Sequence, residues 1–158
     1  MLKETSERLE GAKSVERIRV MLAEDIAILR KALMSLLAPY PDVVIAGEAS
    51  DGLEAVRLVG ELTPQVVLMD LSMPRMDGVE AIAEIKRQHP ETRVIALTAH
   101  GDPELVGKTL LAGADGYMLK NASADELVSA IRSVAAGRQY ISLEVSSLLV
   151  GQPGMCSG

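Results

Sequence analysis

Short apolar runs alternate with longer amphipathic stretches five times along this chain, and this rhythm limits its possible folds more than any other feature. The apolar runs lie at 18–22, 43–46, 65–70, 93–98 and 116–120. Residues at helical spacing follow them, at 25–37, from 50 or 51 to 62, and at 77–88, 102–113 and 123–136. Because strictly alternating strands and helices form parallel sheets with helices on both faces, the chain is predicted to be an α/β protein.

Length and charge narrow the class of protein further. The 158 residues suit one domain with short extensions, and the net charge of −6 comes without any basic stripe. We therefore expect no direct binding of nucleic acid by this chain. No apolar run approaches the roughly 20 residues that a membrane span needs, and a lone cysteine fits a reducing compartment. The protein is predicted to be soluble and cytoplasmic.

Polar side chains stand where the predicted strands end. Glu24 and Asp25 follow the first strand, Asp70 ends the third, Thr98 ends the fourth and Lys120 ends the fifth. Since ligands of open parallel sheets bind outside the carboxyl ends of the strands, these groups are expected to meet at one rim. Taken singly, each has a plain alternative interpretation, such as an acidic residue that starts a helix.

Three carboxylates brought together repel one another and call for positive charge. Lys120 and a divalent cation would supply it, and hard oxygen ligands of this kind suit Mg²⁺. A carboxylate beside such a cation can attack phosphorus and form an aspartyl phosphate. Lys120 would then neutralise the transferred phosphoryl group, and Thr98 would donate a hydrogen bond to it.

Four strings of residues occur in an order that resembles the response-regulator receiver family of two-component systems. They are IRVMLAED at 18–25, LMDLSMPRMDG at 68–78, ALTA at 96–99 and GADGYMLK at 113–120. The resemblance covers about 18–137. It implies a (βα)5 doubly wound parallel sheet, like that of flavodoxin and the chemotaxis receivers. It also implies a signalling phosphoacceptor that catalyses its own phosphorylation and dephosphorylation, and not a conventional enzyme.

The resemblance assigns the acidic residues to roles. Asp70 would be the phosphoacceptor, and Asp25 a direct Mg²⁺ ligand together with Asp70. Glu24 would act on the metal mainly through water, and the backbone carbonyl of Ser72 would be a third ligand.

The remaining roles concern the phosphoryl group and the response to it. Thr98 and Lys120 would form the phosphate-binding pair, and Tyr117 stands at the position of the family's switch aromatic. The output surface would span 102–136, from helix four to helix five. The implied partners are a sensor histidine kinase and, on phosphorylation, a second copy of the chain.

Two further strings, AGADGYMLKN at 112–121 and AAGRQYIS at 135–142, are similar to the NarL/FixJ type of regulator. Regulators of that type continue into a helix-turn-helix DNA-binding domain, for which we find no counterpart here. We predict a charged, flexible leader at 1–17, the receiver domain at 18–137, and a linker or tail at 138–158 that includes one short helix before 150.

Three alternative functions remain. A pseudo-receiver would serve as a phosphorylation-independent protein-interaction module, although it would normally lack one of the key residues. A haloacid-dehalogenase-like phosphatase needs a second carboxylate two residues after the nucleophile, where this chain has Ser72. A flavin or dinucleotide protein would show a glycine-rich loop after the first strand, and this chain has none.

Overall fold

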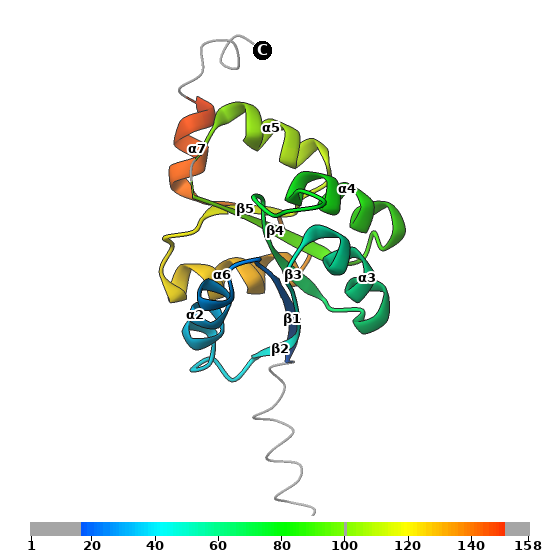
Figure 1. Ribbon diagram of the computed structural model, residues 1–158. Coiled ribbons are helices and arrows are strands. Elements are labelled where there is room, and N and C mark those ends of the chain that lie inside the picture. The colour runs from blue at the N-terminus through cyan, green and yellow to red at the C-terminus, as the bar shows by residue number, and fades with distance from the viewer. Residues whose placement is uncertain (1–16, 100, 151–158) are drawn as a thin grey trace, which may run out of the picture.

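The computed structural model describes residues 17–99 and 101–150, and a six-stranded parallel sheet forms its centre (Figure 1). The strands lie in the order β2-β1-β3-β4-β5-β6, and every neighbouring pair is parallel. They are β1 Ile18–Ala23, β2 Val43–Ala49, β3 Val66–Asp70, β4 Arg93–Thr98, β5 Gly116–Leu119 and β6 Tyr140–Ile141. The predicted α/β fold with a doubly wound parallel sheet is confirmed.

Helices cover both faces of this sheet. They are α2 Ala27–Leu37, α3 Gly52–Leu62, α4 Gly78–Gln88, α5 Pro103–Leu111, α6 Ala124–Ala135 and α7 Leu143–Val150. Figure 1 shows α2 and α6 on one face, and α3, α4 and α5 on the other. None of the helices in the described part of the chain has the length and apolar character that a membrane span requires.

The central strand β3 shows why these short runs become buried strands. Four of its side chains are fully enclosed and alternate between the two layers of the core. Val67 and Met69 belong to the cluster under α3, α4 and α5, whereas Val66 and Leu68 belong to the cluster under α2 and α6. A strand covered on both faces has no place for a polar side chain until it ends, and β3 ends at Asp70.

Four consecutive helices start with a side chain that accepts a backbone N–H, and each carries an acidic residue in its first turn. The capping residues of α3, α4, α5 and α6 are Asp51, Asp77, Asp102 and Ser123. Such caps satisfy N–H groups that have no partner within the helix. Helix α2 differs, because Ile26 stands at its cap position and no acidic residue lies in its first turn.

The structure departs from the sequence prediction at three boundaries. Helix α2 begins at Ala27 and not at Asp25, so both acidic residues lie in the loop before it. Strand β2 continues to Ala49 through a bulge opposite Val20 and Met21. The short helix expected before residue 150 is present as α7, but a two-residue strand, β6, precedes it.

Residues predicted to be linker or tail therefore contact the sheet. Ile141 pairs with Tyr117, the Ser142 N–H donates to the Tyr117 carbonyl at 3.1 Å, and the side chain of Val145 is buried in the core. The placement of the domain boundary at 137 stays a prediction. Residues 1–16 of the predicted leader and 151–158 of the predicted tail lie outside the described residues.

Candidate functional site

Three carboxylates meet where β1 and β3 end. Ala23 pairs with Met69 across these neighbouring strands, so Glu24 and Asp70 emerge side by side. One oxygen from each of Glu24, Asp25 and Asp70 lies within 4.8 Å of the others. Glu24 and Asp70 are buried, whereas Asp25 is exposed. The meeting of carboxylates that the strand ends predict is thus present in the structure.

Lys120 joins two of these carboxylates. Its Nζ lies 3.0 Å from Oε1 of Glu24 and 3.0 Å from Oδ1 of Asp70. The backbone holds it there, because the Lys120 N–H donates to the Thr98 carbonyl at 2.7 Å. Burial of the ammonium opposes its charge, but hydrogen bonds to Asp70 and Glu24 more than offset this, so the pKa of Lys120 is raised. The side chain stays cationic at neutral pH.

The two oxygens of Asp70 have different surroundings. Oδ1 is near Lys120 and also accepts the Ser72 N–H at 3.1 Å. Oδ2 accepts no hydrogen bond from the residues that the structure describes. Asp70 therefore has one oxygen that is held by these contacts and one that accepts no hydrogen bond from the described residues.

Thr98 and Tyr117 lie on the neighbouring strands β4 and β5. Thr98 is buried at the end of β4, and Tyr117 is fully buried with its ring in the core under α3, α4 and α5. Burial raises the pKa of the Tyr117 phenol to about 12, although the nearby Thr98 hydroxyl acts to lower this pKa. The phenol oxygen still has no hydrogen-bond partner of good geometry among the described residues.

We expect Tyr117→Phe to stabilise the fold by about 1 kcal/mol, because a buried polar group without a partner is costly and phenylalanine removes it. Urea denaturation followed by circular dichroism measures the change. Tyr40→Phe is the matched control, since the Tyr40 hydroxyl donates to Asp125 and its loss should lower stability slightly. A loss of stability in Tyr117→Phe would contradict the expectation.

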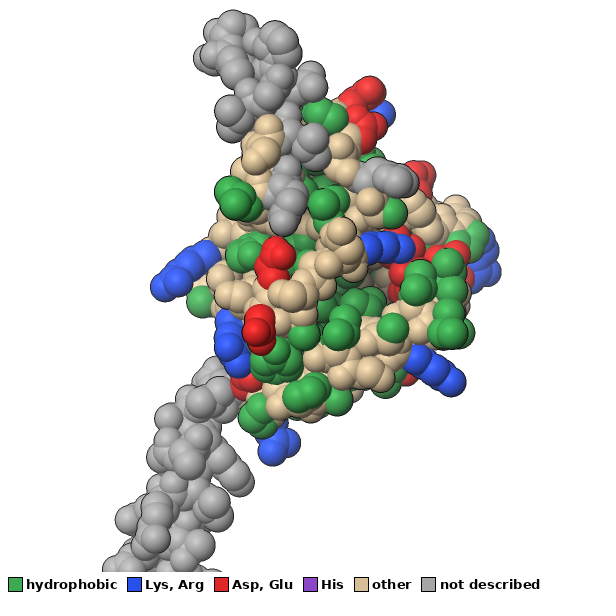
Figure 2. Space-filling model, turned by 90° about the vertical axis from the view of Figure 1, so that its left-hand side faces the viewer, with side chains coloured by type: hydrophobic (Ala, Val, Ile, Leu, Met, Phe, Trp, Pro, Cys, Tyr) green, Lys and Arg blue, Asp and Glu red, His purple; other side chains and the backbone are tan. Residues whose placement is uncertain are grey.

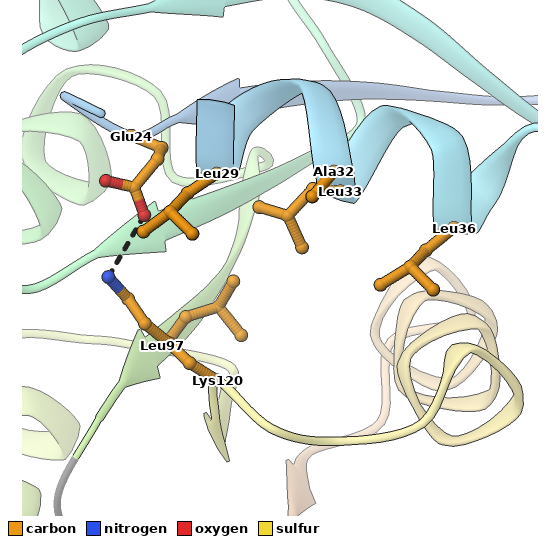
Figure 3. A pocket seen from close by; sticks show the side chains of 7 residues that line it. All are labelled: Glu24, Leu29, Ala32, Leu33, Leu36, Leu97 and Lys120. Carbon is orange, nitrogen blue, oxygen red and sulfur yellow. Dashed lines mark hydrogen bonds and ion pairs between the residues drawn. The ribbon is translucent and has the colours of Figure 1, made fainter. Parts of the chain in front are cut away.

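An apolar pocket of about 110 Å³ adjoins the carboxylates along α2 (Figure 3). Glu24 and Lys120 form its polar end, and its walls are Leu29, Ala32, Leu33, Leu36 and Leu97. Figure 2 shows hydrophobic side chains spread over the face of the molecule that it views. Several long apolar residues of α2 and the loop before it are exposed: Ile26, Ile28, Leu29 and Leu36.

The ligand atoms at this rim determine which metal ion could bind there. Three carboxylate oxygens so close together are hard ligands of the type that Mg²⁺ takes, and no histidine or thiol is among them. The residues present therefore fit a small divalent cation. Ser72, whose carbonyl is predicted as a further ligand, lies two residues after Asp70 in the loop before α4.

Sequence reasoning missed Arg30, which supports this rim. Its Nη1 donates to the backbone carbonyl of Glu24 at 2.5 Å, and its Nε donates to Glu48 at 2.9 Å. A contact from a helix to a carbonyl six residues earlier leaves no mark in a single sequence.

A family model for the response regulator receiver domain matches residues 20–132. This chain belongs to the response-regulator receiver family. The match includes every residue of the rim, and the receiver resemblance drawn from the sequence is confirmed.

Solved and curated receiver proteins agree with this assignment. The chain is 40% identical to the transcriptional regulatory protein LiaR of Bacillus subtilis, over 85% of this chain and 64% of LiaR. A LuxR-family response regulator from Aurantimonas superimposes with a TM-score of 0.80 at 35% identity, over 84% of this chain and 94% of that one. The isolated receiver domain of Salmonella RcsB superimposes with a TM-score of 0.77 at 27% identity, over 84% of this chain and 99% of that one.

The similar curated proteins are mostly transcriptional regulators, and this receiver domain spans about three fifths of their length. The chain is thus a signalling domain of the two-component type, related to the NarL/LuxR regulators.

Proposed function

We propose that this receiver domain accepts a phosphoryl group on Asp70 from a phosphohistidine of a sensor kinase. Oδ2 of Asp70 attacks phosphorus, an O–P bond forms, and the P–N bond breaks as the imidazole leaves with its electron pair. The observation that carries the proposal is the buried Asp70, with one oxygen held by Lys120 and Ser72 and the other without a hydrogen bond from the described residues. Hydrolysis of the aspartyl phosphate by water would release phosphate and return Asp70 to its free carboxylate.

Mg²⁺ is the proposed cofactor. Asp25 and Asp70 would bind it directly, with the Ser72 carbonyl as a further ligand and Glu24 acting through water. Bound there, the cation would offset negative charge on the phosphoryl oxygens. The close approach of the three carboxylates supports this assignment, because such a cluster is stabilised by added positive charge.

Lys120 and Thr98 are proposed to receive the phosphoryl oxygens. Lys120 would exchange its contact with Asp70 for one with the phosphoryl group, and Thr98 would donate its hydroxyl. Tyr117 would follow Thr98 as the switch residue, and the surface from α5 to α6 would carry the change to the output. The full burial of Tyr117 next to Thr98 supports this coupling.

A sensor histidine kinase is the proposed partner. Ile28 is 74% exposed and lies on α2 close to the rim, where an apolar contact would place a kinase helix near Asp70. Homodimerisation on phosphorylation and a role in transcription regulation are proposed by analogy with the regulators to which the chain is similar. The cytoplasmic location remains a prediction from the sequence.

Intact mass spectrometry tests the proposal. The protein is incubated with Mg²⁺ and phosphoramidate, in parallel with a sample in excess EDTA and with Asp70→Asn. We expect a phosphate-sized gain in mass for the parent with Mg²⁺ and none in the other two samples. Asp77→Asn is the matched control and should gain the phosphate. If the parent gains nothing, the proposal fails, and the pseudo-receiver alternative replaces it.

A further inference from the structure

The loop between β1 and α2 carries two of the three clustered carboxylates and enters a helix without a conventional cap. The Ile26 side chain cannot accept a hydrogen bond, whereas α3 to α6 each have a polar cap. The Ile26 N–H instead donates to Oε2 of Glu24 at 3.2 Å, so this N–H is satisfied by one of the clustered carboxylates. The loop therefore needs an anchor from elsewhere.

Arg30, in the second turn of α2, supplies this anchor. Its guanidinium bridges the Glu24 carbonyl at 2.5 Å and Oε1 of Glu48 at 2.9 Å, and its side chain is only 18% exposed. The Glu24 carbonyl and the Asp25 N–H belong to the same planar peptide unit. By binding this carbonyl, Arg30 fixes the plane from which Asp25 projects.

Asp25 is the carboxylate that depends most on its backbone. Lys120 contacts Glu24 and Asp70, but the Asp25 side chain makes no hydrogen bond or ion pair within the described ranges 17–99 and 101–150. Asp25 nevertheless lies within 4.8 Å of both carboxylates, against their repulsion. The hydrogen bond from Arg30 to the Glu24–Asp25 peptide therefore helps to hold the Asp25 carboxylate near the other two.

We propose that Arg30 is a positioning residue for the Mg²⁺ site, which holds Asp25 toward Asp70 before the cation binds. The inference rests on the proposed function, because it takes the carboxylate cluster to be the Mg²⁺ site. A ligand held in place beforehand loses less freedom on binding, so affinity rises. Partners that orient metal ligands typically change metal affinity by about 10–100-fold.

Positioning and simple charge predict opposite results when Arg30 is changed. Arg30 is a cation beside a cation site, so removing its charge alone would strengthen Mg²⁺ binding. Removing its hydrogen bonds would weaken Mg²⁺ binding. Lysine keeps the charge but lacks the planar fork that reaches the Glu24 carbonyl and Glu48 together. The variants Arg30→Gln and Arg30→Lys therefore separate the two effects.

The experiment is a Mg²⁺ titration followed by amide NMR shifts, with thermal unfolding of each variant measured in EDTA. We expect Arg30→Gln and Arg30→Lys each to bind Mg²⁺ about tenfold more weakly than the parent. Arg57→Gln is the matched control, because Arg57 pairs with Glu61 on an exposed part of α3, and its affinity should equal that of the parent.

Three outcomes would overturn the inference. If Arg30→Lys binds like the parent and Arg30→Gln binds more tightly, Arg30 acts through charge alone. If both variants melt at a lower temperature with unchanged affinity, its role is only structural. In both cases the proposed function survives, because the parent binds Mg²⁺. If the parent itself fails to bind Mg²⁺, the proposed function and the inference fall together.

Discussion

Lys120→Met is expected to slow phosphorylation of Asp70 by about 10²–10³-fold, the usual cost of removing one group that stabilises transition-state charge. The methionine side chain has a similar length but cannot neutralise the phosphoryl oxygens. The rate of the mass gain with phosphoramidate at saturating Mg²⁺ measures the effect. A rate within threefold of the parent would remove Lys120 from the proposed mechanism.

The same variant should bind Mg²⁺ more tightly than the parent. Lys120 lies 3.0 Å from Glu24 and from Asp70, so it shares with the cation the charge of the same carboxylates. Its loss leaves the cluster more negative. Lys108→Met is the matched control, because Lys108 makes an exposed pair with Glu104 on α5 and carries the same charge. Neither its rate nor its Mg²⁺ affinity should change.

Gly78→Ala is expected to destabilise the fold by about 3 kcal/mol, because an added Cβ meets backbone. Gly78 starts α4 directly against the strand that carries the phosphoacceptor. A Cβ there would lie 2.5 Å from the Asp70 carbonyl oxygen and 2.6 Å from Cα of Leu71. Neither atom can move without shifting the end of β3, so phosphorylation should slow in the molecules that remain folded.

Gly107→Ala gives the opposite result for the same change of residue. Gly107 lies within α5, and, apart from its chain neighbours and the backbone of its own helix, no atom of the described residues would lie within 4 Å of an added Cβ. Alanine in a helix interior is favoured over glycine, so we expect a gain of about 0.5–1 kcal/mol. Denaturant unfolding of both variants checks the pair. Equal effects of the two substitutions would show that packing around Gly78 is looser than the structure indicates.

The sequence predicted the elements whose burial gives a strong pattern. Strand β3 was recognisable because it is buried on both faces, and its end at Asp70 followed from the first carboxylate after an apolar run. The same reasoning brought Glu24 and Lys120 to one rim. The roles assigned to Asp25, Ser72 and Tyr117 came from the family resemblance and not from the pattern itself.

Features set by tertiary contacts were beyond the sequence. Strand β6 has two residues, which are too few to show any periodicity. It forms because it pairs with β5 in the folded sheet. The late start of α2 could not be read from Glu24 and Asp25, since acidic residues also suit a first helical turn. The reach of Arg30 to a carbonyl six residues earlier, and the inward position of Tyr117, depend on the assembled fold.

The outer strands of the sheet bear on how this domain behaves when it is concentrated. A long flat outer strand offers unpaired N–H and C=O groups to which a strand of another molecule can add. Strand β6 offers two residues on one side. On the other side, β2 is interrupted by its bulge. Both outer strands therefore discourage growth of the sheet from one molecule into the next, and we expect the domain to resist aggregation through its strands.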